Sequence, residues 1–387
     1  MRRKIVLLTS WYPSALSPVS GVFIQEQARL LAERYDVTVI VSHVYGVRAA
    51  LRGGDRPRVE RDGDLLVYHE SVPVPPYNAQ LHTLGHIAAA WRGIDRFVRE
   101  RGRPDLLHAH VVLPCGWVAA QASRRLGISA LLTEHSGPFT VHLRTRLQRR
   151  MVRATIVTLR VLAVSPALRS HILEFAPGAD VRVLGNVVAT RFFTPGEYSA
   201  DDASRATMRF LTIALLVEGK GIQYLLEAVA RLIAHGASPF ELVIGGDGPD
   251  RQRLEAIVRD RGLEDHCRFV GLLDRTQVRH WMRWCDAFIL PSLHETFGIV
   301  LGEAMACGKP VITTRCGGPE YVVDNNCGVL VPPGDPAALA DAMDAFLTGR
   351  IRFDPSLVRN SIVERFGEEA FLRNIAAIYE EFWACNS

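Results

Sequence analysis

Residues 290–310 read LPSLHETFGIVLGEAMACGKP, and this stretch decides the fold that we expect. It continues an apolar run that begins at Ala287 and is typical of a buried strand, and it then breaks into a polar Pro-Ser turn. A helix is predicted from about 298 to 307, because Gly308 stands where a left-handed cap belongs and Pro310 follows it. Such a strand–turn–helix unit presents free backbone N–H groups and a positive dipole end at the carboxyl edge of a sheet, which suits a phosphate.

Two carboxylates accompany this edge, since Glu295 lies in the turn and Glu303 within the helix. Because both would repel a phosphate, we expect them to face a group rich in hydroxyls, and a sugar nucleotide carries phosphates and hydroxyls together. The alternative is a loop acid and a solvated helix acid. Against this alternative, the helix around Glu303 is apolar on most sides, and a buried carboxylate needs partners.

The same half of the chain contains a second candidate phosphate site, after a predicted strand over 209–216. There the turn 218–221 reads Glu-Gly-Lys-Gly, so that two glycines let the backbone approach a diphosphate and Lys220 supplies positive charge. Alone, Lys220 would be a solvated surface lysine. Its place at a strand's carboxyl end, in the same half as the stretch 290–310, favours binding. A helix with one apolar face follows, formed by Leu225, Leu226, Val229 and Leu232.

The first half opens as a strand–loop–helix–strand unit over 4–9, 22–34 and 36–42, which predicts a doubly wound sheet. Gly21 precedes that helix, where backbone can approach an anion closely. Plain turn chemistry is the commoner reason for such a glycine.

Two later strands of the first half end in histidine, at His110 and at His135. Ligands gather beyond the carboxyl ends of parallel strands, so both are candidate site residues. A strand-end histidine can equally be a structural hydrogen-bonding group. His135 is the stronger candidate, because Glu134, Ser136 and Gly137 place it in a polar, tight loop.

At 387 residues the chain is too long for one core, and two domains are expected. With 22% charged and 48% hydrophobic residues, it has the composition of a soluble globular enzyme. No apolar run has the length of a transmembrane helix, and the one near Met1 is too short for a signal peptide. Seven scattered cysteines without a C-x-x-C pair fit a reducing cytosol rather than a disulfide framework or a zinc site.

The predicted division of the chain follows from where the periodicity is lost. We expect a first domain over 1–190, a linker over 191–207, a second domain over 208–365 and a C-terminal helix over 366–387 that packs back toward the first domain. A D-x-D triplet, Asp62-Gly63-Asp64, lies in a predicted hairpin. Because Asp-Gly between strands is a plain turn signal, we predict a turn there and no metal site.

These residues together resemble the retaining family-4 glycosyltransferases of the GT-B fold, the group 1 enzymes akin to glycogen synthase and mannosyltransferases. The resemblance spans nearly the whole chain. In the second half it rests on Lys220-Gly221, Gly246-Asp247-Gly248-Pro249, Phe269-Val270-Gly271, Pro291-Ser292, the pair Glu295 and Glu303, and Gly317-Gly318-Pro319-Glu320. In the first half it rests on Trp11-Tyr12-Pro13-Ser14, Gly21-Val22-Phe23, the two strand-end histidines, and Asn186 followed by Arg191-Phe192. It implies an α/β protein of two Rossmann-like, doubly wound domains that face each other across a cleft.

The resemblance also implies a role for each matching residue. Glu303 would hold the ribose hydroxyls, Glu295 the hydroxyls of the transferred sugar, and Lys220 the diphosphate. His135 would contact the sugar near the reacting carbon, and Gly21 would close over the donor from the first domain. Further donor-binding residues would be Gly221, Phe269 and the backbone of Phe297, Gly298, Ile299 and Val300. On the acceptor side the implied residues are His110 and Asn186.

The implied reaction transfers a hexosyl group from a UDP- or GDP-sugar to a lipid-linked or polysaccharide glycan, with retention and with neither a cofactor nor a metal. One position departs from the family, since Leu215 stands where an arginine is often a second diphosphate cation. Lys220 and the helix dipole would then carry more of the leaving-group charge, or another arginine reaches in. A sugar-nucleotide epimerase of the same architecture and a non-catalytic sugar-binding protein are the alternatives. The phosphate-suited Lys220 and the lack of a signal peptide argue against the binding protein.

Between Glu134 and Glu174 the sequence has arginines but no acidic residue. On a helix over 142–160 one side would carry Leu143, Leu147, Met151 and Ala154. Either this is an ordinary helix packed on the sheet, or the arginines within Arg144–Arg160 contact anionic lipid headgroups, with each charge worth about 1 kcal/mol. The second interpretation predicts a cytoplasmic enzyme that docks reversibly on the inner face of the membrane, near a lipid-linked acceptor. With a net charge of only +4, no nucleic-acid partner is expected.

Overall fold

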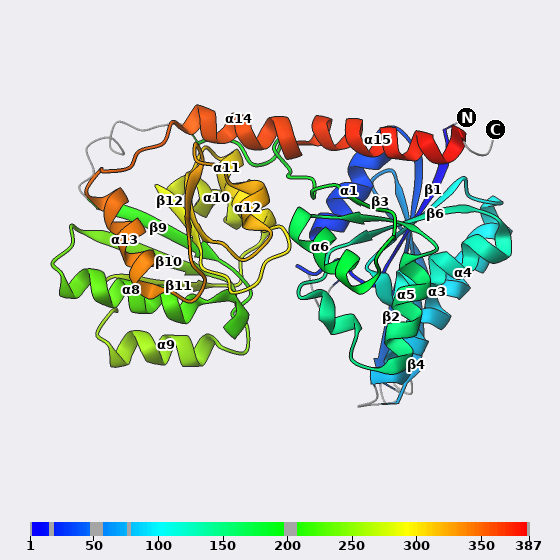
Figure 1. The fold of residues 1–387 in the computed structure, drawn as a ribbon, viewed down its shortest axis with the longest axis horizontal. Helices are drawn as coiled ribbons and strands as arrows, with labels where there is room; N and C mark the ends of the chain where they lie inside the picture. The colour runs from blue at the N-terminus through cyan, green and yellow to red at the C-terminus, as the bar shows by residue number, and fades with distance from the viewer. Residues whose placement is uncertain (1, 15–18, 47–56, 76–78, 197–206, 385–387) are drawn as a thin grey trace. The chain divides into compact units, whose positions relative to one another are not determined.

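The computed structural model of the chain, shown in Figure 1, describes residues 2–14, 19–46, 57–75, 79–196 and 207–384. The chain divides into two compact units, each with its own sheet. Unit 1 contains Met1–Val187 with Leu372–Ser387, and unit 2 contains Val188–Phe371. The boundary lies a few residues before the predicted one, and residues 197–206 of the predicted linker are outside the described part.

Unit 1 has an eight-stranded sheet in the order β3-β4-β2-β1-β5-β6-β7-β8. Its strands are β1 (Lys4–Thr9), β2 (Asp36–Gly46), β3 (Arg58–Asp62), β4 (Leu65–Val74), β5 (Leu106–His110), β6 (Ser129–Glu134), β7 (Arg160–Ala163) and β8 (Val181–Val183). Its helices are α1 (Val22–Ala32), α3 (Ala79–Arg101), α4 (Trp117–Leu126), α5 (Arg146–Ile156) and α6 (Pro166–Phe175), with short helical turns at η1 (Val112–Gly116) and η2 (Phe139–His142). The strands pair in parallel except β3 and β4, which form the predicted hairpin.

Unit 2 has a six-stranded sheet in the order β11-β10-β9-β12-β13-β14, parallel throughout. Its strands are β9 (Met208–Ile213), β10 (Phe240–Gly245), β11 (Cys267–Gly271), β12 (Ala287–Leu290), β13 (Val311–Thr314) and β14 (Gly328–Val331). Its helices are α8 (Ile222–Ala234), α9 (Arg251–Asp260), α10 (Arg275–Trp284), α11 (Ile299–Ala306), α12 (Pro319–Val322), α13 (Pro336–Leu347) and α14 (Pro355–Phe366), with a 3-10 turn at η3 (Glu218–Lys220).

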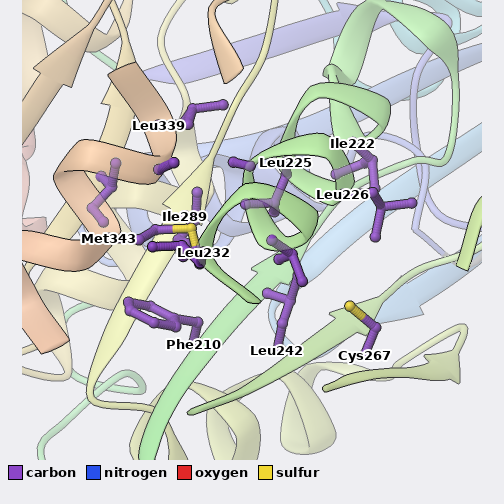
Figure 2. Packing of buried hydrophobic residues seen from close by; sticks show 14 of the residues in the cluster. Phe210, Ile222, Leu225, Leu226, Leu232, Leu242, Cys267, Ile289, Leu339 and Met343 are labelled. Atoms are coloured by element: carbon purple, nitrogen blue, oxygen red, sulfur yellow. The ribbon is translucent and has the colours of Figure 1, made fainter. Parts of the chain in front are cut away.

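The core of unit 2 confirms the apolar face predicted for α8. Leu225, Leu226, Val229 and Leu232 are buried together with side chains of the sheet and of α13. Figure 2 shows this packing, in which Phe210, Leu242 and Ile289 come from β9, β10 and β12. Because α8 is fixed in this way, the turn that precedes it, with Lys220, has a defined position on the sheet.

Each sheet has a point at which the strand order reverses. In unit 1, β1 pairs with both β2 and β5, and in unit 2, β9 pairs with both β10 and β12. In open α/β sheets, ligands bind beyond the carboxyl ends of the strands at such a switch point. Strand β5 ends at His110, and the loops after β9 and β12 contain Lys220 and Glu295. The topology therefore places the predicted site residues where parallel sheets bind ligands.

The C-terminal region contains one more helix than predicted, since α14 precedes a final helix, α15 (Glu368–Ala384). From Leu372 onward the chain belongs to unit 1. There the Tyr379 hydroxyl lies 2.7 Å from Nδ1 of His108, and Glu381 pairs with Arg160 and Arg182. No helix of the described residues is both long and apolar enough to cross a membrane.

The helix predicted over 142–160 was wrong in its bounds and in its packed side. The α5 helix ends at Ile156, and β7 begins at Arg160. Met151 is buried as predicted, but Leu147 is 54% exposed, because the side that packs on unit 1 is Met151, Val152, Thr155 and Ile156. Arg160 also leaves the predicted arginine surface, since it binds Asp180 and Glu381.

Candidate active site

The loops after β9 and β12 meet in unit 2 through an ion pair. Nζ of Lys220 donates to Oε2 of Glu295 at 2.7 Å, and the Ser292 hydroxyl donates to the same oxygen at 3.3 Å. The backbone of Leu293 donates to Gly219 O at 2.9 Å, so the loops are also joined through their main chains. The structure therefore brings together two residues that the sequence placed in separate motifs.

Gly221 is the glycine on which this meeting depends. Its φ is +70°, and a Cβ there would lie 2.0 Å from the carbonyl oxygen of Pro291. No other residue could bring the backbone of the Lys220 turn so close to the loop after β12. Gly221 is therefore needed for the site's geometry, independently of any contact with a ligand.

The N-terminus of α11 opens beside Glu295. Gly298 has a φ of +83° and caps the helix without a side-chain hydrogen bond, and the first-turn N–H groups of Ile299 and Val300 have no partner within the helix. Phe297 is only 1% exposed and packs against Tyr321 and Phe366, so its ring anchors the turn and its backbone is the part available to a ligand.

The Gly317-Gly318 turn completes this part of the site. Gly317 forms an isolated β-bridge with Glu295, and the Gly318 N–H donates to the Glu295 carbonyl at 2.8 Å. A Cβ on Gly318 would lie 2.3 Å from the backbone nitrogen of Phe297. Glu295 is consequently held on both sides, by Lys220 and by this turn.

Glu303 has a partner that the sequence could not identify. It is 5% exposed and forms an ion pair with Arg275 at the start of α10. The Arg275 guanidinium lies 4.5 Å from the ring centroid of Phe193. The apolar surroundings of Glu303 indicated that a partner was needed, but nothing in the sequence linked it to a residue 28 positions away.

Two further predicted positions, Leu215 and Phe269, lie on or next to strands of the same sheet. Leu215, just after β9, is 59% exposed, so an apolar side chain occupies the position of the expected cation. Phe269 lies within β11 and is half-buried. Because β10 separates β11 from β9, Phe269 is two strands away from the Lys220 turn.

In unit 1 the two strand-end histidines lie together. Nδ1 of His110 is 3.0 Å from Nε2 of His135, and the two rings stack with centroids 5.2 Å apart. His108 stacks on His110 at 4.6 Å. Burial lowers the pKa of His108 and of His135 to about 3, and it lowers the pKa of His110 well below its ordinary value. The three rings are therefore neutral near pH 7.

The loop after β6 is held by the buried carboxylate of Glu134. It accepts from the backbone N–H of Val112 at 2.7 Å, of His135 at 3.0 Å and of Ser136 at 2.7 Å. Nε2 of His142, the last residue of η2, lies 2.8 Å from the Ser136 hydroxyl, so this helical turn is bound to the loop after β6. No sequence pattern indicated that His142 would contact Ser136.

Asn186 and the helix that begins after Gly21 both contact the same histidine. Gly21 has a φ of +68°, and a Cβ there would lie 2.4 Å from the backbone of Trp11. The helix that it starts brings the Phe23 ring to 4.9 Å from the His135 ring. The Asn186 side chain hydrogen-bonds to His135 and favours its protonated form, against the larger effect of burial. The predicted residues of unit 1 thus form one cluster around His135.

Asp62 of the D-x-D triplet is bound to helix α1. Its carboxylate accepts from Gln25 at 2.7 Å, from Arg29 at 2.6 Å and from the Tyr12 hydroxyl at 3.3 Å. Among the described residues, no group of three or more His, Cys, Asp or Glu side chains is placed to hold a metal ion.

Comparison with known sequences gives two successive family matches. The family described as "Glycosyltransferase Family 4" matches residues 20–192, and the family described as "Glycosyl transferases group 1" matches residues 205–364. TuaC of Bacillus subtilis, named for a proposed role as a teichuronic acid biosynthesis glycosyltransferase, is 30% identical over 89% of each chain. N-acetyl-alpha-D-glucosaminyl L-malate synthase of Bacillus anthracis is 27% identical over 97% of each chain.

Solved structures share the fold at low sequence identity. Sucrose-phosphate synthase from Thermosynechococcus elongatus superposes with a TM-score of 0.80 at 21% identity, covering 99% of this chain and 100% of that one. Alr3699/HepE of Anabaena, in complex with UDP-glucose, superposes with a TM-score of 0.70 at 20% identity, covering 98% of this chain and 99% of that one.

Proposed function

This chain belongs to family 4 of the glycosyltransferases, the group 1 enzymes, and has the GT-B fold, and we propose that it transfers a sugar from a nucleotide-diphosphate sugar to a glycan with retention of anomeric configuration. The single observation that carries the proposal is the meeting of Lys220, Glu295 and the α11 N-terminus at the switch point of unit 2. This edge combines fixed positive charge with a hydroxyl acceptor, as a sugar nucleotide requires.

In the proposed mechanism, breaking the anomeric bond places negative charge on the departing diphosphate. The Lys220 ammonium and the first-turn N–H groups of α11 stabilise that charge, and they are already in place because Gly221 and Phe297 fix both loops. Glu295 accepts from hydroxyls of the transferred sugar, while Glu303, oriented by Arg275, accepts from those of the ribose. With Leu215 in place of an arginine, Lys220 carries the larger share of the leaving-group charge.

We assign no metal to this reaction. The carboxylate of Asp62 is already used by Gln25 and Arg29, which gives the D-x-D triplet a structural purpose. The charges described above can stabilise the diphosphate without a divalent cation.

On the acceptor side, the proposal assigns His135 to the sugar near the reacting carbon. His110 and Asn186 both form hydrogen bonds with the His135 ring, so we assign them a positioning role for that ring. The natural acceptor class in this proposal is a lipid-linked or polysaccharide glycan.

The proposal includes reversible contact with the inner face of the cytoplasmic membrane through α5. Leu147, which is 54% exposed, lies among the exposed arginines 144, 146 and 150 at the start of α5, and Val157, which is 61% exposed, follows the end of the helix. A basic surface with apolar side chains exposed between its charges suits a membrane of anionic lipids. This position would bring the enzyme to a lipid-linked acceptor.

A screen of UDP- and GDP-sugars for protection against thermal unfolding tests the donor, and NMR of the product anomer tests retention. We expect one sugar nucleotide to raise the melting temperature and to be consumed only when a glycan acceptor is added. Consumption without acceptor, with a new sugar isomer formed, would establish the alternative of an epimerase, which neither of the two relatives named above supports. An inverted product would refute retention.

A further inference from the structure

A cavity of about 550 Å³ opens on the outer side of β14, the edge strand of unit 2. One wall is β14 with Arg315 and the residues Asn325 and Asn326, and the other is the segment 350–354 between α13 and α14 together with Leu357 of α14. The volume is within the range of sites that bind small molecules. Because β13 lies between β14 and β12, this cavity is two strands away from the Lys220–Glu295 pair.

Some of the charged side chains that line the cavity are paired within the protein, and others are not. Asp354 caps α14 by accepting from the N–H groups of Ser356 and Leu357, and Arg350 pairs with Asp344 at 2.6 Å. In contrast, Arg315 and Arg352 have no side-chain hydrogen bond or ion pair with any residue that the structure describes. The cavity thus contains two guanidinium groups whose charge is not compensated within the described protein.

The fold holds the backbones of both arginines. The N–H of Arg315 donates to Val331 O at 2.8 Å, where β13 and β14 end. Arg352 follows a turn fixed by the bond from Ile351 N–H to Ala345 O at 3.1 Å. Its guanidinium lies over Gly349, where a Cβ would be 3.1 Å from one of its nitrogens. Both side chains are exposed, so the backbone bonds set where each arginine borders the cavity and leave its guanidinium accessible to an anion.

We propose that this cavity binds a phosphorylated sugar, at a site separate from the donor site. Arg315 and Arg352 bind the phosphate, because a guanidinium fork matches phosphate oxygens. The amides of Asn325 and Asn326 both donate and accept, which suits sugar hydroxyls. Phe353, which stacks on Phe346 with centroids 5.7 Å apart, provides an apolar wall with Leu357 for the face of a sugar ring.

Isothermal titration of the full chain with three probes tests the site: glucose 6-phosphate, inorganic phosphate and glucose. We expect saturable binding of glucose 6-phosphate, at least tenfold weaker binding of inorganic phosphate, and none of glucose. Arg315→Gln and Arg352→Gln should each weaken the binding of glucose 6-phosphate by about tenfold or more. This is the loss typical of a hydrogen bond to a charged group. Arg253→Gln, an exposed arginine on α9 outside the cavity, is the matched control and should bind as wild type.

Competition separates this site from the donor site, because Arg315 is only two residues before Gly317, which pairs with Glu295. Saturating UDP should leave the affinity for glucose 6-phosphate unchanged. Three results would each overturn the proposal: displacement of glucose 6-phosphate by UDP, wild-type affinity for glucose 6-phosphate in both cavity variants, or absence of saturable binding. Since no transfer is measured, failure of the proposed reaction would leave this result intact.

Discussion

Nζ of Lys220 lies 2.7 Å from Oε2 of Glu295, although the two residues are 75 positions apart in the chain. Their side chains are 27% and 15% exposed, so each charge is partly withdrawn from water and compensated by the other. A bound sugar nucleotide would offer phosphate to the ammonium and hydroxyls to the carboxylate. In the proposed reaction, the pair would therefore orient two groups that act on neighbouring parts of one substrate.

We expect Lys220→Ala to lower turnover by about 100-fold or more, the scale observed when one preorganised charge stabiliser is removed. Glu295→Ala should have a similar effect. Neither should change the melting temperature greatly, because a partly exposed ion pair contributes about 1 kcal/mol or less. Initial rates and thermal melts of both variants check this prediction, and full activity in either would remove that residue from the site.

The double variant distinguishes a shared role from two separate ones. If the residues act as a pair on one transition state, the loss in Lys220→Ala/Glu295→Ala should be clearly smaller than the product of the two single losses. Multiplicative losses would mean that the ion pair has no functional coupling.

Arg275→Gln should weaken donor binding, because Glu303 loses the partner that orients it. We expect a donor KM about tenfold higher, with kcat changed less, and partial rescue in Arg275→Lys. Arg279→Gln is a matched control, since Arg279 lies on the same helix and over Phe192 without contacting Glu303. Equal KM values for the two glutamine variants would argue against a role for Glu303 in donor binding.

The sequence predicted which loops carry the candidate residues of unit 2, because strand-ending apolar runs and glycine turns are local patterns. Lys220, Glu295 and Gly221 were all identified in this way. Their contact distances, and the partner Arg275, depend on which strands become neighbours, and that is a property of the whole sheet. No local pattern contains this information.

Two features of the structure that differ from the prediction also have physical causes. Leu147 fits a helical apolar stripe, but α5 is packed on only one narrow side, so a residue at the stripe's margin stays exposed. The missed helix α14 had a local signal in Asp354 followed by Pro355, a cap and a proline at the first helical position. The contact between His142 and Ser136 had no local signal, because it depends on the path of the loop after β6.

Chelation should leave transfer unaffected, since the proposed mechanism stabilises the diphosphate without a metal. Asp62→Asn should likewise keep activity and lose only the stability that Asp62 provides by binding α1. Burial alone would raise the pKa of Asp62, but hydrogen bonds from Arg29 and Gln25 outweigh it and lower that pKa. This stabilisation is present above the unfolded-state pKa and lost as pH falls through the lower folded-state value. Assays of transfer with and without EDTA test this prediction. Activity that is lost on chelation and restored by manganese would show that a metal is necessary.

The buried histidines predict a loss of stability on mild acidification. His108 and His135 have a folded-state pKa of about 3, and that of His110 is also low, while in the unfolded chain each binds a proton below about pH 6.5. Stability is therefore full above about pH 6.5 and decreases as pH falls toward the folded-state values. Each histidine adds a slope of about 1.4 kcal/mol per pH unit.

Denaturant unfolding at pH 7, 6 and 5 measures this slope. His110→Gln should reduce it by about 1.4 kcal/mol per unit, whatever its effect on stability at pH 7. His171→Gln, at an exposed position of α6, should keep the wild-type slope. A slope unaffected by His110→Gln would show that this histidine is accessible to protons in the folded state.

Sedimentation with liposomes tests the membrane surface on α5. Arg149 and Arg153 are bound within unit 1, to Leu143 O and Phe175 O, so the residues to change are Arg144, Arg146 and Arg150. Binding should require anionic lipid and fade as salt is raised. The Arg144/Arg146/Arg150→Gln variant should bind about 100-fold more weakly, at about 1 kcal/mol per charge. Leu147→Ser should also weaken binding, because its exposed side chain enters the interface.

A matched variant, Arg253/Arg259/Arg261→Gln, removes the same charge from exposed positions in unit 2 and controls for net charge alone. It should sediment as wild type. If the two triple variants sediment to the same extent, at the wild-type level or below it, the α5 arginines form an ordinary solvated surface. Selective loss in the α5 variant, with transfer to a water-soluble acceptor unchanged, would locate the defect in membrane docking rather than in the donor site.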